Sequence, residues 1–462
     1  MATTPVIRDA ALLDDAALQA FRDQLRGPLL LPEDPDYDAA RIVWNAMIDH
    51  HPALIARARG AADVMATVNF ARDHDLVLSI KGGGHSVSGK AVAEGGLMLD
   101  LSLMKGIRVD PNRRTVRAES GVLWQELDRE THAFGLATPG GVVGTTGIAG
   151  LSLGGGQSWI VSKYGFTIDN LLSIDIVTAD GQLRHVNAEE NPDLFWAIRG
   201  AGHNFGVATS FEYRLHAVHT VLGGMLLYPI DRAADVLRFY REFSVTQPDE
   251  LTTYAALLTA PDGNLVAAII PCYTGDLDEG MRVLAPIRAY GPPIVDTIAP
   301  IPHPVMQGLI TAAYPEGRQN YWKSALSNRL SDKLIDTLID HAGEMPSPYS
   351  VIVIIDCHGA YRRVGKTETA YYHRDKQYDV VLTANWEDPA ENERNIGWTR
   401  ACFDAIKPEL EEGAYVNDLG DDEANPAARA YGGNYPRLVE LKTKYDPTNL
   451  FRMNQNIKPA AQ

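Results

Sequence analysis

Glycine is concentrated in two short segments of this 462-residue chain, and these segments constrain the fold more than any other feature. The first is Lys81-Gly-Gly-Gly-His85-Ser86, which directly follows the apolar run 76–80. The second is 138–156, where glycines recur between apolar anchors such as Leu151. Glycine permits positive φ and lets the backbone come close to a flat ligand or to other backbone. We therefore expect a strand that ends in a glycine loop, and a second loop that wraps a cofactor.

Length and charge narrow the class of protein. A chain of 462 residues exceeds one ordinary core, so two or three domains and room for a large cofactor are expected. The formal net charge of −17 would repel nucleic acid and anionic membranes, which leaves small molecules as partners. The sequence contains neither a signal-peptide pattern nor a run of the ~18 apolar residues that span a bilayer. We expect a cytoplasmic monomer or homodimer with no membrane contact.

The cysteines give no sign of a disulfide framework or a metal site. Cys272, Cys357 and Cys402 are far apart, odd in number and without metal-ligand spacing. We interpret them as structural thiols and predict no metal.

Hydrophobic periodicity predicts helices alternating with short strands. The predicted helices are 63–74, 124–132, 193–198, 233–243 and 332–342. The predicted strands are 76–80, 97–101, 106–110, 115–118, 171–179, 207–215, 223–228, 265–270 and 350–355. The strands lengthen after residue 215, which indicates an inserted α+β domain. The predicted division is 1–215, 216–414, and a tail, 415–462, that rejoins the first part.

Two glycine motifs resemble nucleotide-binding fingerprints without satisfying them. Residues 84–91 approach the P-loop, but Ala91 stands where a magnesium-binding Ser or Thr is required. Residues 200–206 resemble a dinucleotide fingerprint, but a helix precedes them and a strand follows, which is the reverse of the required order. A tight turn explains these glycines better. From local pattern alone, His85 is either a hydrogen-bonding turn residue or a functional group.

Taken together, the motifs resemble the berberine-bridge-enzyme-like flavoproteins of the vanillyl-alcohol-oxidase superfamily, and within them bacterial oxidases of the 6-hydroxy-D-nicotine oxidase type. The resemblance covers nearly the whole chain. It rests on residues 82–86, 147–156, 163–165, 169–170, 194–206, 431–442, 445–447, 449–452 and 454–457. It implies an α+β fold: a PCMH-type FAD-binding domain with an inserted α+β substrate domain, whose antiparallel sheet is covered by helices.

The resemblance also implies the cofactor and its attachment. In the family, the histidine matched by His85 bonds to the 8α-methyl group of FAD, and a neutral imidazole is nucleophilic enough to attack it near pH 7. Several relatives add a cysteinyl bond at the position that Val143 occupies here, so His85 is expected to be the only tether. The implied cofactor-binding residues are Lys81, Gly82, Gly83, Gly84, Ser86, Gly89, Pro139, Gly140, Gly144, Gly147, Gly150, Leu151, Gly154, Gly155, Tyr164, Asn170, Gly206, Val207, Asn454 and Asn456.

The catalytic group is less well defined. Relatives place a functional tyrosine in the segment matched by 415–418, where this chain has Asp418 at that position. An aspartate serves as a base if burial raises its pKa toward neutrality, but a loop aspartate without a catalytic role is an equal alternative. Tyr415 is the second candidate. Further alternatives that the sequence does not rank are Tyr321, Tyr371, Tyr372 and Asp356.

The implied activity is oxidation of a small organic molecule by FAD. Hydride would pass from a C–H bearing an alcohol or amine of a sugar, alkaloid or secondary metabolite to flavin N5, and O₂ would be reduced to H₂O₂. The alternatives are a dehydrogenase that does not react with oxygen, a flavoprotein that catalyses an oxidative or non-redox cyclisation, and a flavin-binding protein without turnover. Fold-level likeness does not identify the substrate.

Overall fold

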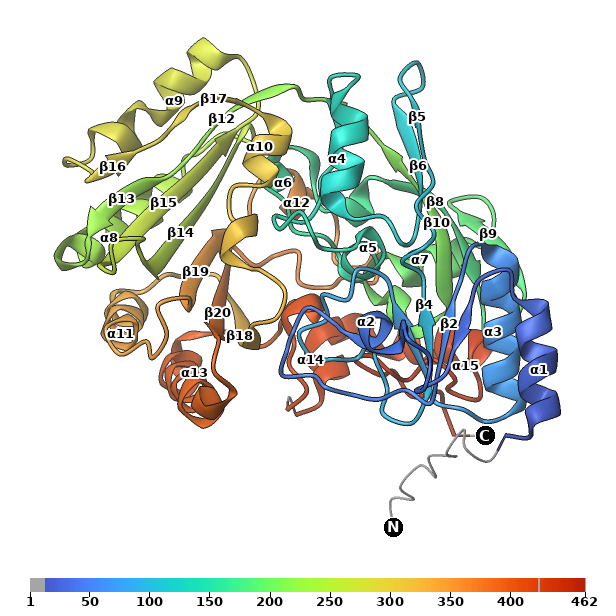
Figure 1. The fold of residues 1–462 in the computed structure, drawn as a ribbon. Helices are drawn as coiled ribbons and strands as arrows, with labels where there is room; N and C mark the ends of the chain where they lie inside the picture. The colour runs from blue at the N-terminus through green and yellow to red at the C-terminus, as the bar shows by residue number, and fades with distance from the viewer. Residues whose placement is uncertain (1–12, 423, 462) are drawn as a thin grey trace.

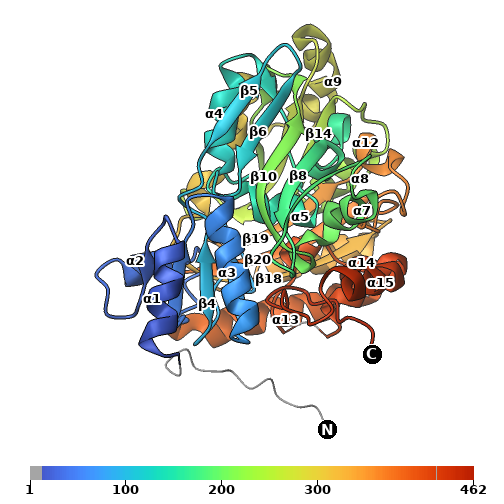
Figure 2. The same ribbon diagram turned by 90° about the vertical axis from the view of Figure 1, so that its right-hand side faces the viewer.

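Two sheets form the N-terminal part of the chain in the computed structural model, which describes residues 13–422 and 424–461. The first has the strand order β1-β2-β4-β3, in which β2, β4 and β3 are parallel and β1 is antiparallel. Helices α1 and α3 lie side by side against this sheet, with Phe21 stacked on Phe70 (Figures 1 and 2). The bounds are α1 Asp15–Gln24, β1 Leu29–Leu30, α2 Tyr37–Arg41, β2 Leu54–Arg57, α3 Ala61–Asp73, β3 Leu78–Lys81 and β4 Leu97–Asp100.

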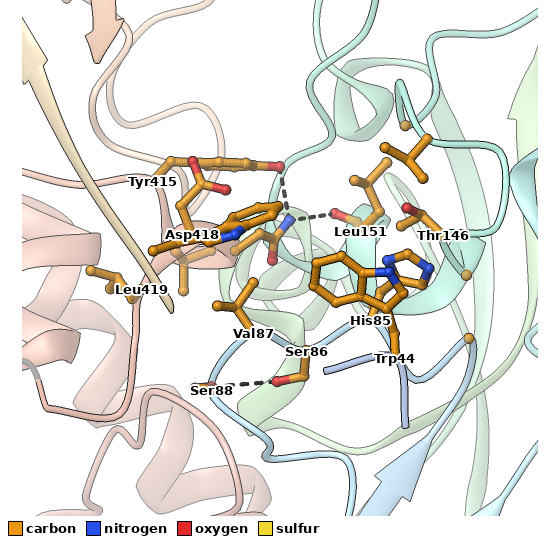
Figure 3. Close-up of a pocket in the computed structure, with 18 of the residues that line it drawn as sticks. Trp44, His85, Ser86, Val87, Ser88, Thr146, Leu151, Tyr415, Asp418 and Leu419 are labelled. Atoms are coloured by element: carbon orange, nitrogen blue, oxygen red, sulfur yellow. Dashed lines mark hydrogen bonds between the residues drawn. The ribbon is translucent and has the colours of Figure 1, made fainter. Parts of the chain in front are cut away.

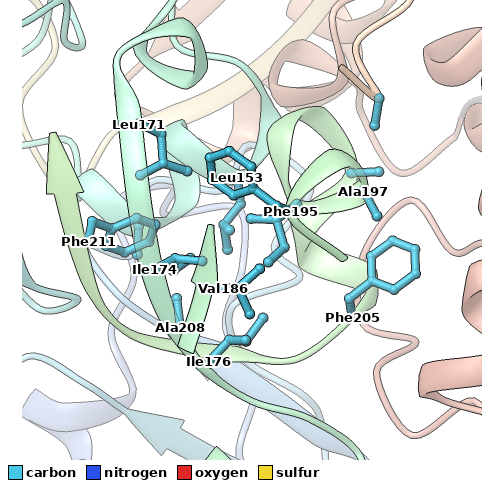
Figure 4. Packing of buried hydrophobic residues seen from close by; sticks show 14 of the residues in the cluster. Leu153, Leu171, Ile174, Ile176, Val186, Phe195, Ala197, Phe205, Ala208 and Phe211 are labelled. Atoms are coloured by element: carbon cyan, nitrogen blue, oxygen red, sulfur yellow. The ribbon is translucent and has the colours of Figure 1, made fainter. Parts of the chain in front are cut away.

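The second sheet is antiparallel, with the order β5-β6-β10-β8-β9. Leu153 of α5 and Phe195 of α7 pack with Ile174 and Phe211 of the sheet in one continuous core (Figure 4). The bounds are β5 Ile107–Asp110, β6 Thr115–Glu119, α4 Trp124–His132, β7 Leu136–Ala137, α5 Ile148–Gly154, α6 Val161–Tyr164, β8 Leu171–Val177, β9 Leu183–Asn187, α7 Pro192–Ala201, β10 Val207–Arg214 and β11 His216–Ala217.

A larger antiparallel sheet follows, with the order β16-β13-β15-β14-β19-β20-β18 and β12 and β17 joined at one side. Helices α8, α11 and α13 cover one face of it (Figure 1). The strands are β12 Thr220–Gly223, β13 Leu226–Pro229, β14 Leu251–Thr259, β15 Leu265–Tyr273, β16 Val295–Asp296, β17 Ala299–Pro302, β18 Gln319–Ser327, β19 Val351–Asp356 and β20 Tyr378–Trp386. The helices are α8 Ala233–Ser244, α9 Leu277–Ala289, α10 His303–Gln307, α11 Asp332–Ala342, α12 Ala360–Arg363 and α13 Asn392–Ile406.

The C-terminal segment packs back on the first part of the chain through α15 and α7. Its helices are α14 Pro426–Tyr431 and α15 Tyr435–Tyr445. The fully buried ammonium of Lys442 holds it there: Nζ donates to the carbonyl of Asn204 at 2.7 Å and to that of Phe451 at 2.8 Å, and pairs with Asp446 at 2.6 Å. The predicted domain limits themselves stay a prediction.

The α+β fold with a helix-covered antiparallel sheet is confirmed, and two local predictions are wrong. The segment 138–156 is not loop throughout, because Ile148, Ala149, Ser152 and Leu153 have helical spacing and bury one face of α5. The strand predicted at 223–228 is divided into β12 and β13, because Gly224 adopts φ +150°.

Cys272, Cys357 and Cys402 are buried free thiols. In the part of the chain that the structure describes, no three His, Cys, Asp or Glu side chains are grouped so as to hold a metal ion. Over the same residues, no helix is both long enough and apolar enough to cross a membrane.

Candidate functional site

A cavity of about 320 Å³ lies where the glycine loops, the open face of the large sheet and the segment 415–419 meet. Figure 3 shows His85 and Trp44 on one side of it and Asp418 and Tyr415 on the other. Its lining includes apolar side chains of the sheet, such as Val353, Ile355 and Val381. One cavity therefore connects segments more than 300 residues apart in sequence.

The glycine loop after β3 is built by close contact between two stretches of backbone. A Cβ atom on Gly83 would lie 2.3 Å from the nitrogen of Gly147, and one on Gly147 would lie 2.4 Å from the nitrogen of Gly83. No side chain is tolerated at either contact. Gly84 adopts φ +72°, and the backbone N–H groups of 83–86 make no hydrogen bond to any described residue. Free N–H groups in such a turn form a concavity that binds phosphate oxygens.

His85 projects from this loop into the cavity. Its ring stacks on Trp44 with 4.8 Å between centroids, and Nε2 lies 2.9 Å from Oγ1 of Thr145. Burial lowers the pKa of His85 to about 4, so the imidazole is neutral at pH 7. When Nε2–H donates to Thr145, Nδ1 keeps its lone pair, and no described residue forms a hydrogen bond with Nδ1. This geometry presents a nucleophilic nitrogen to the cavity.

Helix α5 leaves space beside the cavity at Gly150. A Cβ atom there would meet no protein atom within 4 Å, although Gly150 is inside a helix and lines the cavity. Glycine inside a helix costs about 1 kcal/mol relative to alanine. The protein itself therefore leaves this side of the cavity open at Gly150.

The segment 415–419 forms the opposite wall. The hydroxyl of Tyr415 accepts hydrogen bonds from the N–H of Gly156 at 2.7 Å and from Nδ2 of Asn417 at 2.8 Å, and burial raises its pKa. Tyr415 thus fixes the end of the second glycine segment. Asp418 faces the cavity, and burial raises the pKa of its carboxyl to about 7. A carboxyl with that proton affinity exchanges a proton readily at neutral pH.

Several buried polar atoms at or near the cavity lack a protein partner. They are Oε1 of Gln157, Nε1 of Trp322, Oδ1 of Asn454 and Oδ1 of Asn456. Buried polar atoms are normally satisfied, and three of these four, on Gln157, Trp322 and Asn454, belong to residues that line the cavity. The free N–H groups of 83–86 and the open space at Gly150 lie on the same cavity wall and leave room there for a phosphate-bearing cofactor.

The structure brings about half of the predicted residues to the cavity wall and leaves the others outside it. Those that line it are Gly82, Gly83, Gly84, His85, Ser86, Gly147, Gly150, Leu151, Tyr415, Asp418 and Asn454. Those outside its lining are Lys81, Gly89, Pro139, Gly140, Gly144, Gly154, Gly155, Tyr164, Asn170, Gly206, Val207 and Asn456. Their part in cofactor binding stays a prediction.

Some residues outside the lining have clear structural contacts. A Cβ on Gly140 would overlap the ring of Trp124 at 2.2 Å, and one on Gly206 would lie 2.4 Å from the carbonyl oxygen of Val177. Lys81 Nζ donates to the carbonyls of Ala40 and Ile42 at 2.7 and 2.8 Å. These contacts hold the loops in place.

The alternative catalytic residues do not line the cavity. Tyr321 donates a hydrogen bond to Asp422 at 2.5 Å, and the hydroxyl of Tyr371 lies 3.0 Å from that of Tyr361. Asp356 pairs with His358 at 2.5 Å. Tyr372 is likewise outside the lining, so Asp418 and Tyr415 remain the candidates with access to a ligand.

Sequence reasoning missed the residues that the large sheet contributes. Tyr254, Val353, Ile355, Val381 and Thr383 line the cavity from β14, β19 and β20. The alternation of side chains along a strand could have placed 353 with 355, and 381 with 383, on a common face. Nothing in the sequence indicates which face meets the glycine loops. Trp44 and Thr145, which contact His85, had no signal of their own.

Comparisons with known proteins agree with this geometry. Residues 52–187 match the model of an FAD binding domain, and residues 414–458 match the berberine and berberine-like model. An FAD-linked oxidoreductase of Dictyostelium discoideum is 33% identical over 420 residues, covering 90% of this chain and 91% of the relative. (R)-6-hydroxynicotine oxidase of Paenarthrobacter nicotinovorans is 30% identical over 453 residues, covering 94% and 97%.

A solved structure extends the likeness to the whole fold. The crystal structure of 6-hydroxy-D-nicotine oxidase from Arthrobacter nicotinovorans superposes with a TM-score of 0.86 at 28% identity, covering 94% of this chain and 98% of the other. Both matched regions, 52–187 and 414–458, contribute residues to the cavity. The chain therefore belongs to the berberine-bridge-enzyme-like family of FAD-linked oxidoreductases and is an enzyme.

Proposed function

We propose that this enzyme is an oxidase that removes hydride from a C–H bearing an alcohol or amine of a small organic molecule, with O₂ as the final acceptor. The observation that carries the proposal is the cavity itself. A neutral imidazole, His85, and a carboxyl of near-neutral pKa, Asp418, face the same space from opposite walls. When bound, FAD supplies a hydride acceptor at N5 and passes the two electrons to O₂, which leaves as H₂O₂.

The chain would hold FAD from one wall and tether it through His85 alone. Gly83 and Gly84 expose backbone N–H groups suited to the pyrophosphate, and the space beside Gly150 admits a flat ring. The neutral ring of His85 keeps a lone pair at Nδ1 for the covalent bond. Val143 lines the same cavity with an aliphatic side chain, so no second bond forms there.

The opposite wall would bind the substrate. Val353, Ile355 and Val381 offer an apolar surface, and Thr383 a hydroxyl, to a molecule lying on the sheet. Asp418 would then accept the O–H or N–H proton of the substrate as the general base. Tyr415, held by Gly156 and Asn417, would keep the wall in place and orient the base.

Two measurements test the cofactor and the reaction separately. Flavin should stay with the protein after acid precipitation, and a pellet without flavin would refute the covalent link. In anaerobic photometry, a suitable alcohol or amine should bleach the flavin, and readmitted O₂ should restore the colour with one H₂O₂ per turnover. A screen should begin with hydroxylated N-heterocyclic amines, since a relative is named (R)-6-hydroxynicotine oxidase.

The alternatives give different results in the same experiment. A dehydrogenase would be bleached by the substrate but would recover its colour slowly in O₂, without stoichiometric peroxide. A non-redox cyclase would convert its substrate with no bleaching. Neither outcome would alter the family assignment, because that rests on the whole chain.

A further inference from the structure

The segment that follows Asp418 continues around the edge of the large sheet. Asp418 and Leu419 line the cavity, and Figure 3 shows both side chains on its wall. The short turn that carries Asp418 packs against β18, which is the last strand of the sheet. Asp422, three residues after Leu419, binds side chains on the other face of this strand. Residues 419–422 therefore form a strap that runs from the cavity face of the sheet to its helix-covered face.

The side chains of β18 identify the two faces that the strap joins. Trp322 lines the cavity, and a Cβ on Gly420 of the strap would lie 3.6 Å from the carbonyl oxygen of Trp322. Tyr321 and Lys323 flank Trp322 and point to the other face, because side chains alternate along a strand. There Tyr321 packs with the hydrophobic core under α13, and Nζ of Lys323 lies 6.0 Å from the ring centroid of Phe403 of that helix. The strap thus crosses the sheet edge at Trp322.

Side chains rather than backbone hold the strap in place. Within the described chain, no backbone-to-backbone hydrogen bond joins 419–422 to another segment. Three side chains instead donate to the carboxylate of Asp422. They are the hydroxyl of Tyr321 at 2.5 Å, Nζ of Lys323 at 2.8 Å and Nη2 of Arg400 of α13 at 2.9 Å. Asp422 is therefore the anchor of the strap on the helix-covered face.

The other contacts of the strap are weaker. Asp421 forms an ion pair with Lys90, but the side chain of Asp421 is 70% exposed, so water screens the pair and it contributes little. Nε2 of Gln455 donates to the carbonyl of Leu419 at 3.2 Å. The side chain of Lys323 is only 8% exposed, which shields its bond to Asp422 from water. Release of Asp422 would remove the strongest link between the strap and the sheet.

Asp418 directly precedes the strap, so the position of its carboxyl depends on the strap. We propose that Asp422 is a positioning residue that fixes the strap over the edge of β18 and thereby holds Asp418 against the cavity, away from bulk water. This inference rests on the proposed role of Asp418 as the base. Asp422 itself does not line the cavity, so it would act only through the strap.

The anchor remains charged over the pH range in which Asp418 titrates. Burial alone would raise the pKa of Asp422, but the hydrogen bonds from Lys323 and Tyr321 outweigh burial and hold this pKa at about 2. Burial raises the pKa of Asp418 to about 7. A loosened strap would admit water to Asp418 and lower its pKa toward the usual value of about 4. The pH at which Asp418 titrates therefore reports whether the strap is in place.

The substitution D422N removes the charge of the anchor and so weakens its three bonds, with little change in volume. The limiting rate of flavin reduction at pH 8 should fall about tenfold or more, because the base is less precisely positioned. The acid limb of the pH profile should move down by about 1 pH unit, since a hydrated Asp418 ionises at lower pH. R400Q removes one of the three donors and should shift the limb in the same direction by less. R394Q is the matched control, because Arg394 also lies on α13 but pairs with Glu391, outside the strap.

Infrared difference spectroscopy of the holoenzyme measures the titration of Asp418 without substrate or O₂. D418N identifies the protonated carboxyl band, whose midpoint should lie near pH 7 in the wild type and in R394Q, and about 1 pH unit lower in D422N. A midpoint that D422N leaves unchanged would overturn the proposal, as would a loss of rate that is uniform across pH. If D422N did not fold, R400Q would decide by the same criterion, because it leaves Asp422 in place.

The infrared result is independent of the proposed oxidase activity. Failure of every alcohol and amine to bleach the flavin would refute the proposed function. The midpoint of the Asp418 band would still decide whether Asp422 positions that carboxyl.

Discussion

The two walls of the cavity are built in different ways. The wall around His85 is shaped by close backbone contact: Gly83 and Gly147 touch main chain to main chain, and Gly150 leaves a space that no side chain fills. The wall formed by the sheet and residues 415–419 consists of side chains, among them Val381, Thr383 and Asp418. In the proposed arrangement the backbone wall holds the cofactor that relatives have in common, and the side-chain wall meets the substrate. Substitutions on the two walls should therefore fail differently.

The largest effect is expected on the side-chain wall. D418N removes the proposed base and leaves an amide of the same size, so flavin reduction should slow by about 10²- to 10⁴-fold, the range for loss of a general base. The flavin should remain bound, because the backbone wall is untouched. Stopped-flow photometry under anaerobic conditions measures this rate. A variant that reduces its flavin at the wild-type rate would remove Asp418 from the mechanism.

Asp128 is a buried acid outside the cavity lining, so its substitution should change stability without changing activity. Burial raises the pKa of Asp128 to about 7, from an unfolded value of about 3.9. Below the unfolded value both states are protonated. As pH rises toward 7 the unfolded state ionises first, so Asp128 lowers the free energy of unfolding by up to about 4 kcal/mol, and the penalty is constant above pH 7.

The free energy of unfolding of D128N, relative to that of the wild type, should therefore be higher at pH 8 than at pH 4.5. Urea unfolding of the holoenzyme at the two pH values measures the difference, and the activity profile should not move. The hydrogen bond from Nε2 of Gln307, at 3.3 Å, is retained if Asn presents its oxygen. Equal stability differences at both pH values would show that Asp128 is ionised in the native protein.

On the backbone wall, H85A should lose the covalent flavin. The acid-precipitated pellet should be colourless, and the flavin held without the bond should be reduced about 10- to 100-fold more slowly, as expected when a reactant is less precisely positioned. H219A is the control, because His219 is exposed and absent from the cavity lining. If H85A kept its flavin in the pellet, another side chain would have to be the tether.

The same contrast explains what could be predicted from the sequence. The strand before Gly82 and the order of elements around 200–206 could be predicted from the sequence. Glycine positions and the spacing of hydrophobic residues depend directly on backbone geometry. Val381 and Thr383 could not be predicted as site residues, because side chains alternate along a strand whether or not one of its faces meets a cavity. Only the packing of the large sheet against the glycine loops determines which face of the strand lines the cavity. The helix α5 was missed because glycine content outweighed the helical spacing of its apolar residues.

The smallest effect is expected for G150A. This substitution separates an effect on the stability of the protein from an effect on cofactor binding. In the protein alone the added methyl group meets no atom within 4 Å, and alanine is the better helix former by about 1 kcal/mol, so the apoenzyme should become slightly more stable. In the holoenzyme the same methyl group would enter the space that we propose for the cofactor, so flavin content or the rate of flavin incorporation should fall. Thermal unfolding of apo and holo forms measures both changes. G397A is the control. Gly397 also lies inside a helix, and an added Cβ there would meet no atom within 4 Å, but Gly397 does not line the cavity. G397A should therefore stabilise the apo and holo forms equally. A gain of similar size in both forms of G150A would mean that the space beside α5 is not a cofactor site.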